Sequence, residues 1–183
     1  MRVPRTFAFV DLSGFTNYTA AFGDDAAGRI LSAFRTLVRG IASERGVRIA
    51  KWLGDGCMVV SIDQSNAVAF ALELENRSAE VCAPLSLRVG IATGYALLFE
   101  GDDYIGSAVN MAARLCDAAG PFEVLLPTMQ LERLPEGVTA TPYGEVELRG
   151  FPGPIDVIEL SGQPVLAARN DTGELWTRSP FLL

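Results

Sequence analysis

Residues 47–62, with the sequence VRIAKWLGDGCMVVSI, form two apolar, strand-like runs on either side of Gly54-Asp55-Gly56. An Asp-Gly pair between two such runs predicts a β-hairpin, because both residues tolerate the positive φ angles of a tight turn. We therefore expect strands at Val47–Leu53 and Cys57–Ile62. A hairpin at this point interrupts the βαβ alternation of a parallel sheet, and it favours a mostly antiparallel sheet.

Strand and helix patterns alternate on both sides of this hairpin. Before it, Phe7–Leu12 is predicted as a strand and Asp24–Arg45 as a helix, whose apolar residues recur at helical spacing up to a stop at Gly46. After it, we expect a helix capped by Ser65 or Asn66 and running to about Val81, followed by strands at Leu85–Thr93 and Tyr95–Phe99 that Gly94 separates. A second helix is then predicted, capped by Ser107 and running to about Ala119. The last predicted elements are a strand at Phe122–Leu126, a short helix at Thr128–Leu134 and a hairpin within Val146–Leu160. The order β-α-β-β-α-β predicts an α+β fold with a ferredoxin-like core, in which helices cover a mostly antiparallel sheet.

The composition limits the chemistry that such a protein can perform. The chain has 183 residues, a formal net charge of −7 and no His, which excludes Ser-His-Asp and Cys-His nucleophile systems and imidazole metal sites. Any bound metal must then be a hard cation held by oxygens or an ion held by cysteine. An acidic chain is a poor general binder of nucleic acid, since phosphate contacts need clustered Lys and Arg, so no nucleic-acid partner is predicted.

Length and cysteine usage fit a single domain in a reducing compartment. We expect a domain over residues 1–160 and a C-terminal tail of unknown role over residues 161–183. No apolar run is long enough to span a membrane, and the first residues lead directly into a strand, so a cytoplasmic protein without a signal peptide is predicted. The apolar residues near the end of the tail are expected to pack on the same domain or on a second copy: Trp176, Phe181, Leu182 and Leu183.

Two aspartates occupy positions that need an explanation. Asp11 follows an apolar strand in FVDLSGFT (residues 9–16), where a charge is costly unless it is paired or binds a metal. Helix capping would explain Asp11, and turn propensity would explain Asp55 in the hairpin. If their strands are neighbours, the two carboxylates can instead bind Mg²⁺ together. The turn after Asp11 resembles a strand-to-helix junction, whose free amides can bind phosphate, at Gly14, Phe15 and Thr16.

A third polar cluster lies in GDDYIGSAVNMAARL (residues 101–115). Asn110 and Arg114 are four residues apart, so on a helix they project from one face. Taken alone, such a pair is common on protein surfaces and does not indicate a function.

Together the three clusters resemble the catalytic domain of the class III nucleotide cyclases, the adenylate and guanylate cyclase family. Each short motif is weak, but their joint occurrence in this order is highly specific, and the resemblance extends over about Thr6–Leu160. The matching segments are Phe9–Thr16, Lys51–Met58, Arg88–Gly94, Asp103–Leu115 and Glu147-Leu148-Arg149-Gly150.

The resemblance implies a role for each matching residue. Asp11 and Asp55 correspond to the metal-binding aspartates of the family, and the backbone carbonyl of Leu12 corresponds to a further metal ligand. Lys51 and Asp103 correspond to the pair that reads the purine.

Two further matches concern the reacting groups. Asn110 and Arg114 correspond to the catalytic pair that orients the ribose and stabilises the transition state. Arg149 corresponds more loosely to a basic residue near the terminal phosphates, and it completes the substrate-binding set with Lys51, Asp103 and the turn at residues 14–16.

These matches imply an adenylate cyclase, a phosphorus–oxygen lyase that forms 3′,5′-cyclic AMP and pyrophosphate from ATP. Lys51 can only donate, which suits N1 of adenine, and ionised Asp103 can only accept, which suits the 6-amino group. The family implies two Mg²⁺ or Mn²⁺ ions per site and in-line attack by the ribose 3′-oxygen on the α-phosphorus. The acceptor of the 3′-hydroxyl proton stays open between Asp11, solvent and a substrate phosphate. It also implies a homodimer with active sites at the interface, in which one protomer supplies the metal ligands and its partner the other residues.

Some features depart from the family, and alternatives remain open. Ala92 stands where many members have His, and the stretch from Gly94 to Asp103 is short, which implies a reduced dimerisation arm. One alternative is a cyclase that uses GTP or a pyrimidine nucleotide. Another is a non-catalytic cyclase-like module that binds nucleotide or dimerises, and a third is a ferredoxin-like scaffold with no nucleotide role.

Overall fold

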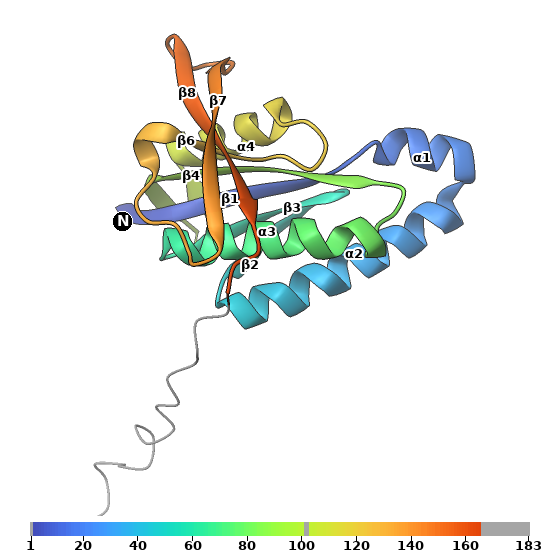
Figure 1. Cartoon of the computed structure of the whole chain (residues 1–183). Coiled ribbons are helices and arrows are strands. Elements are labelled where there is room, and N and C mark those ends of the chain that lie inside the picture. The colour runs from blue at the N-terminus through green and yellow to red at the C-terminus, as the bar shows by residue number, and fades with distance from the viewer. Residues whose placement is uncertain (1, 101–102, 166–183) are drawn as a thin grey trace, which may run out of the picture.

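The structure, a computed structural model, describes residues 2–100 and 103–165. These residues form an α+β fold around an 8-stranded sheet with the order β2-β3-β1-β4-β6-β8-β7, in which β5 pairs with β4 outside this path (Figure 1). In chain order the elements are β1 (Arg2–Ser13), α1 (Phe15–Phe22), α2 (Asp24–Arg45), β2 (Arg48–Leu53), β3 (Gly56–Ser61), α3 (Gln64–Val81), β4 (Ser86–Phe99), β5 (Asp103–Ile105), α4 (Ser107–Ala118), β6 (Val124–Pro127), the 3₁₀ turn η1 (Thr128–Gln130), β7 (Val138–Glu147) and β8 (Pro154–Gly162).

The predicted core topology is confirmed. β1 lies between β3 and β4 and is antiparallel to both, and β2 pairs with β3, which gives the strand order of a ferredoxin-like unit. Only β4 and β6 pair in parallel among the described strands. Helices α2 and α3 lie on one side of the sheet and α4 on the other, while the β7–β8 hairpin projects from the body (Figure 1).

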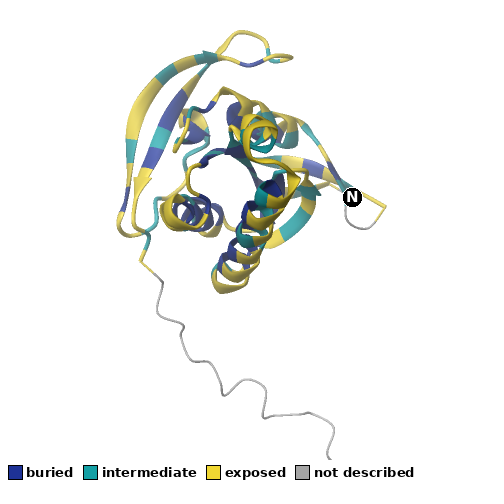
Figure 2. Cartoon of the chain, turned by 90° about the vertical axis from the view of Figure 1, so that its right-hand side faces the viewer, coloured by how far each residue is buried: buried dark blue, intermediate teal, exposed yellow. Residues whose placement is uncertain are grey.

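Two apolar layers hold the helices on the sheet. Alternate residues of β1 face opposite sides, so Val10 and Leu12 pack in the larger layer under α2 and α3, and Phe7 packs in the layer under α4. The buried positions of the helices face inward in both layers (Figure 2). The expected apolar stripe of α2 is buried, except for the partly buried Leu31, and the helix ends at Gly46 in the left-handed conformation. None of the described helices is long and apolar enough to cross a membrane.

A close approach at Gly90 seats α4 on the sheet. A Cβ atom at this position of β4 would collide with backbone atoms of Ala112 and Cys116 in α4. The backbone of the helix therefore lies directly on the strand, and no other residue type leaves room for that contact. Since α4 carries Asn110 and Arg114, this contact fixes the height of both side chains above the sheet.

Several predicted boundaries were wrong. Gly94 does not separate two strands, because it pairs with Arg5 inside the continuous strand β4. Helix α3 is capped by Asp63, whose side chain accepts from the Ser65 amide, and not by Ser65 or Asn66. Ser107 is the first residue of α4 and makes no capping hydrogen bond.

The end of the chain also differs from the expectation. The short helix at Thr128–Leu134 is only the 3₁₀ turn η1, and the final hairpin is longer than Val146–Leu160, because its first strand begins at Val138. The tail residues for which packing was expected lie outside the described residues: Trp176, Phe181, Leu182 and Leu183.

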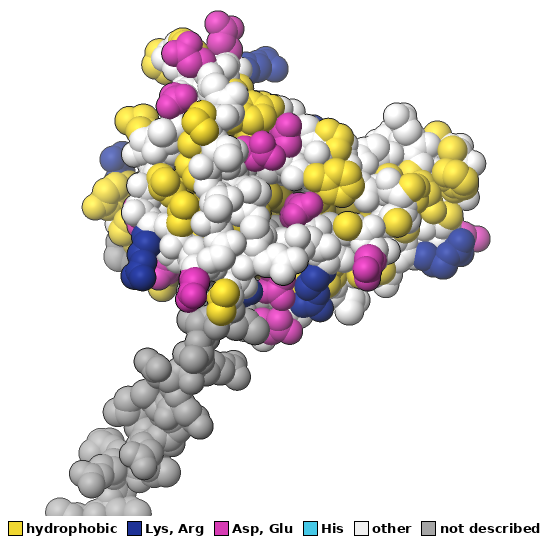
Figure 3. Space-filling model, viewed as in Figure 1, with side chains coloured by type: hydrophobic (Ala, Val, Ile, Leu, Met, Phe, Trp, Pro, Cys, Tyr) yellow, Lys and Arg dark blue, Asp and Glu magenta, His cyan; other side chains and the backbone are white. Residues whose placement is uncertain are grey.

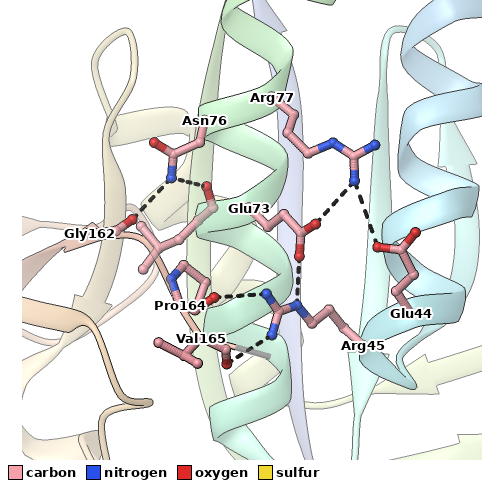
Figure 4. Close-up of polar contacts among 9 residues, drawn as sticks. Glu44, Arg45, Glu73, Asn76, Arg77, Gly162, Pro164 and Val165 are labelled. Carbon is pink, nitrogen blue, oxygen red and sulfur yellow. Dashed lines mark hydrogen bonds and ion pairs between the residues drawn. The ribbon is translucent and has the colours of Figure 1, made fainter. Parts of the chain in front are cut away.

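A polar cluster around the largely buried Arg45 and Glu73 fastens the end of β8 to α2 and α3 (Figure 4). Arg45 donates from Nε to Glu73 at 2.7 Å and from its Nη atoms to the backbone carbonyls of Pro164 at 3.0 Å and Val165 at 3.4 Å. Asn76 donates to the carbonyl of Gly162 at 3.0 Å. These bonds fix the chain where it leaves β8, and they involve none of the predicted site residues.

The substitution Gly90→Ala tests the contact between α4 and β4. Overpacking of this kind costs about 1–3 kcal/mol, so we expect the free energy of unfolding to fall by that amount in urea titrations. Gly40→Ala is the matched control, because Gly40 is exposed within α2 and nothing lies within 4 Å of an added Cβ. The control should gain about 0.5–1 kcal/mol of stability. Equal stability of Gly90→Ala and wild type would contradict the close packing of α4.

Candidate active site

Asp11 lies near the end of β1, on the side of the sheet that carries α4. Its register partner in β4 is Arg88, whose Nη2 and Nε atoms donate to Asp11 Oδ2 at 2.6 Å and 2.9 Å. Both side chains are partly buried, with 27% of Asp11 and 29% of Arg88 exposed. Because both nitrogens contact Oδ2, the second oxygen of Asp11 forms no hydrogen bond within the described chain and remains available to a ligand.

Asp55 reaches the same region from the β2–β3 turn. The next residue, Gly56, pairs with Asp11, and a Cβ at Gly56 would collide with the backbone of Val10, so glycine is needed where these strands approach. Burial raises the pKa of the Asp55 carboxyl, its own backbone amide opposes that rise, and the neighbouring Asp11 charge adds to it. The pKa of Asp55 thus responds to both Asp11 and Arg88, as expected for a shared site.

The turn after Asp11 leads directly into helix α1. The Leu12 side chain is buried in the core, so only its backbone can contribute to a site. Gly14 adopts a left-handed conformation at the start of α1, and no side chain caps the helix. No acidic residue lies in the first turn of α1, which includes Phe15 and Thr16, so its amide groups face no competing carboxylate there.

Lys51 and Asp103 come from distant parts of the sequence and form an ion pair. Their Nζ and Oδ1 atoms are 2.7 Å apart, and both side chains are close to half exposed. The hydrogen bond from Lys51 and that from the Tyr104 amide lower the pKa of Asp103, which keeps its carboxyl ionised. Lys51 pairs with Met58 on the side of β3 that faces the α4 layer, so this ion pair and Asp11 share one side of the sheet.

Asn110 and Arg114 lie on the exposed face of α4, as the spacing predicts. Arg114 forms an ion pair with Asp117 at 3.2 Å, and the carbonyl of Asp117 accepts from Arg88 at 3.3 Å. The side chain of Asn110 makes no hydrogen bond within the described chain. Both groups can therefore turn toward a ligand without breaking a buried contact.

Arg149 lies apart from these groups. It is exposed in the loop between β7 and β8, in the projecting hairpin (Figure 1). Acidic side chains gather on this hairpin in the space-filling view (Figure 3), and Glu145, Glu147 and Asp156 are exposed there. No contact joins Arg149 to Asp11 or Asp55 within the described chain.

The structure thus forms two clusters on one side of the sheet and does not join them within one chain. The first cluster contains Asp11, Asp55 and Arg88, and the second is the pair of Lys51 and Asp103. The sequence motifs assigned no role to Arg88. The available signal was a lone charge in the apolar run Leu87-Arg88-Val89, but only the register of β1 on β4 shows that it meets Asp11.

The donor atoms of the first cluster fit a hard divalent cation. Two carboxylates, one with an oxygen that has no hydrogen-bond partner, and a nearby main-chain turn are the oxygen ligands that Mg²⁺ and Mn²⁺ prefer. A cysteine-held ion is a poor alternative, because burial raises the pKa of Cys57 and of Cys116 to about 12 and keeps both thiols protonated.

Comparison with known protein sequences gives consistent matches. Residues 4–161 match the family described as the adenylate and guanylate cyclase catalytic domain. An uncharacterized protein of Mycobacterium tuberculosis is 35% identical over 156 residues, which are 85% of this chain and 41% of that protein. An adenylate cyclase of Streptomyces coelicolor is 36% identical over 126 residues, which are 69% of this chain and 33% of that enzyme. The chain thus spans less than half the length of these curated relatives.

Solved structures share the fold at lower identity. The adenylyl cyclase CyaB from P. aeruginosa superposes with a TM-score of 0.79 at 24% identity, over 91% of this chain and 98% of that one. The guanylyl cyclase Cya2 gives a TM-score of 0.79 at 21% identity, over 93% of this chain and 96% of that one. The shared fold therefore does not distinguish between the two bases.

The stability of the metal-free protein should respond to the charge of Asp55. Because burial raises the pKa of this carboxyl, its ionised form is less favourable in the folded than in the unfolded chain, and stability falls as pH rises through its titration. We expect Asp55→Asn to have a higher melting temperature than wild type at pH 7.5 without metal, and this gain should shrink as the pH is lowered. Millimolar Mn²⁺ should raise the melting temperature of wild type and leave Asp55→Asn unchanged. An equal response of both proteins to Mn²⁺ would contradict a metal site at Asp55.

Proposed function

The chain belongs to the adenylate and guanylate cyclase catalytic domain family, and from this premise we propose that it converts ATP to 3′,5′-cyclic AMP and pyrophosphate as a homodimer. In this reaction the ribose 3′-oxygen attacks the α-phosphorus, and the bond between the α-phosphorus and the bridging oxygen of pyrophosphate breaks. The enzyme would be a phosphorus–oxygen lyase.

The Lys51–Asp103 ion pair is the observation that carries the choice of ATP. The pair is half exposed, one partner is a pure donor and the ionised partner is a pure acceptor. Adenine offers an acceptor at N1 and a donor at its 6-amino group, which matches the pair. Guanine offers the reverse pattern, so each buried mismatch would cost about 1–3 kcal/mol.

Asp11 and Asp55, with the carbonyl of Leu12, would bind two divalent cations, Mg²⁺ or Mn²⁺. These ions would lower the pKa of the ribose 3′-hydroxyl and neutralise charge on the triphosphate. In the structure Arg88 forms an ion pair with Asp11. We expect its guanidinium to turn toward the β- and γ-phosphates when the cations occupy the carboxylates.

Arg114 would stabilise the charge that develops on the α-phosphoryl group, and Asn110 would orient the ribose. A planar guanidinium suits phosphoryl oxygens, and removal of one such preorganised donor typically slows catalysis by ~100–1000-fold. The uncapped turn at Gly14, Phe15 and Thr16 would bind phosphate oxygens through its amides, since no first-turn carboxylate competes there. Arg149 would reach the terminal phosphates.

A homodimer explains why the two clusters do not meet within one chain. One protomer would supply Asp11 and Asp55, and its partner would supply Lys51, Asp103, Asn110 and Arg114. The β4–β5 arm supports such an interface, because it exposes large apolar side chains at Tyr95, Leu97, Phe99 and Ile105.

Product analysis tests the proposed reaction. The purified chain is incubated with Mn²⁺ and, in separate reactions, with ATP, GTP, CTP or UTP, and products are identified by mass spectrometry. We expect cyclic AMP as the main product and a loss of at least ~100-fold for Asp11→Ala. Another cyclic nucleotide would contradict the assignment of Lys51 and Asp103 and leave the fold and metal site intact. No product from a confirmed dimer would favour a non-catalytic module.

Mixing two inactive variants tests the shared site. Asp11→Ala and Arg114→Ala should each be inactive alone, since each removes one half of every site. In a heterodimer of the two, one site is intact and the other lacks both residues. Equal mixing of a symmetric dimer should therefore restore about a quarter of wild-type activity. No recovery after verified subunit exchange would show that both residues act within one protomer.

A further inference from the structure

Arg35 on α2 contacts the turn that carries Asp55 from the side of the sheet opposite the proposed substrate. Its Nη2 atom donates to the backbone carbonyl of Gly54 at 3.2 Å. The side chain is partly buried, and its Nε atom is shielded from solvent without a hydrogen-bond partner in the described chain. A buried donor without a partner is costly, so packing alone does not account for an arginine at this position.

Trp52 fixes the direction in which Arg35 points. The guanidinium carbon of Arg35 lies 5.1 Å from the centroid of the Trp52 ring, and that of Arg39, one helical turn later, lies 5.2 Å from it. Both distances are typical of cation–π contacts. The two arginines thus share one aromatic partner on β2, but only Arg35 also bonds to the β2–β3 turn in the described chain.

The bond from Arg35 acts on the peptide group that precedes Asp55. The carbonyl of Gly54 and the amide of Asp55 belong to one rigid plane, so fixing the carbonyl also fixes the direction of the amide. That amide belongs to the backbone of Asp55, so the orientation of this peptide sets the direction in which the Asp55 side chain leaves the turn. Gly54 has a φ of 64° and no side chain, so the residue itself does little to restrain this peptide.

We propose that Arg35 is a positioning residue, which holds the Gly54–Asp55 peptide so that the Asp55 carboxylate is oriented for a divalent cation. This role rests on the proposed metal-binding function of Asp55. Arg35 itself touches neither the cation nor the nucleotide, because it lies on the α2 side of the sheet. Its contribution is of the kind made by groups that orient metal ligands, whose loss typically lowers metal affinity by 10–100-fold.

The test compares Arg35→Met with Arg39→Met in the whole 183-residue chain. Methionine keeps the unbranched stem that packs on Trp52 and removes the charge and the donor. At saturating ATP we expect Arg35→Met to raise the Mn²⁺ concentration for half-maximal activity by at least ~10-fold, while the rate at saturating Mn²⁺ falls by less than ~3-fold. Arg39→Met should leave both quantities unchanged. Arg35→Lys keeps a donor near the Gly54 carbonyl and should recover most of the metal affinity.

Two results would overturn the proposal. One is an unchanged Mn²⁺ requirement in Arg35→Met, and the other is an equal increase in Arg39→Met, which would assign the effect to the Trp52 contact. Thermal melts without metal show whether each variant is folded. If Arg35→Met does not fold, Arg35→Gln, which is too short to reach Gly54 in the same way, gives the same contrast with Arg35→Lys.

Direct binding of Mn²⁺ separates the positioning role from the proposed cyclase reaction. The EPR signal of free Mn²⁺ is measured without nucleotide for wild type, Arg35→Met and Asp55→Ala. Suppose that both variants bind Mn²⁺ more weakly than wild type, while the wild-type chain forms no cyclic nucleotide. This result would support the positioning role and refute the cyclase activity. Binding that is unaffected by Asp55→Ala would refute the metal role of Asp55, and the positioning role would fail with it.

Discussion

The antiparallel pairing of β1 with β3 on one side and β4 on the other determines where the site residues lie. This register sets Asp11 opposite Gly56, next to Asp55, and opposite Arg88. A shift of β1 by one residue would turn Asp11 into the apolar layer under α2 and α3 and bring Val10 or Leu12 to the opposite side. Gly56 permits the close approach of β3 at this point, and Gly90 permits that of α4 two residues beyond Arg88. The site therefore depends on backbone contacts before any side chain acts.

The charged residues of the candidate site form ion pairs with one another. Asp11 pairs with Arg88, Lys51 with Asp103 and Arg114 with Asp117. Each pair is partly or largely exposed, so it stabilises the fold little and can be exchanged for a ligand at low cost. In the proposed reaction a cation would replace Arg88 at Asp11, a purine would join Lys51 and Asp103, and a phosphoryl group would replace Asp117 at Arg114.

Short sequence patterns correctly predicted the elements that depend on residues close together in the chain. Helix α2 has the expected bounds, because its apolar stripe has helical spacing and Gly46 adopts the left-handed conformation that ends it. The hairpin at Gly54-Asp55-Gly56 also follows from its own residues. Gly94 was misread as a break, because pairing with Arg5 continues the strand through it. Arg88 and Arg35 could not be assigned roles from the sequence, since each acts on a residue distant in the chain, and the roles of the predicted site residues stay predictions.

In the proposed dimer, Asp11 and Asp55 of one protomer bind the cations while Lys51 and Asp103 of the other protomer hold the adenine. This division of the site is tested most directly by a crystal structure of the protein with Mn²⁺ and a non-cyclisable ATP analogue, in which anomalous scattering locates the metal. We expect Mn²⁺ between Asp11 and Asp55, Arg88 released from Asp11, and adenine within hydrogen-bond distance of the Lys51–Asp103 pair of the second protomer. Mn²⁺ bound elsewhere, or adenine held by the protomer that binds the metal, would contradict it.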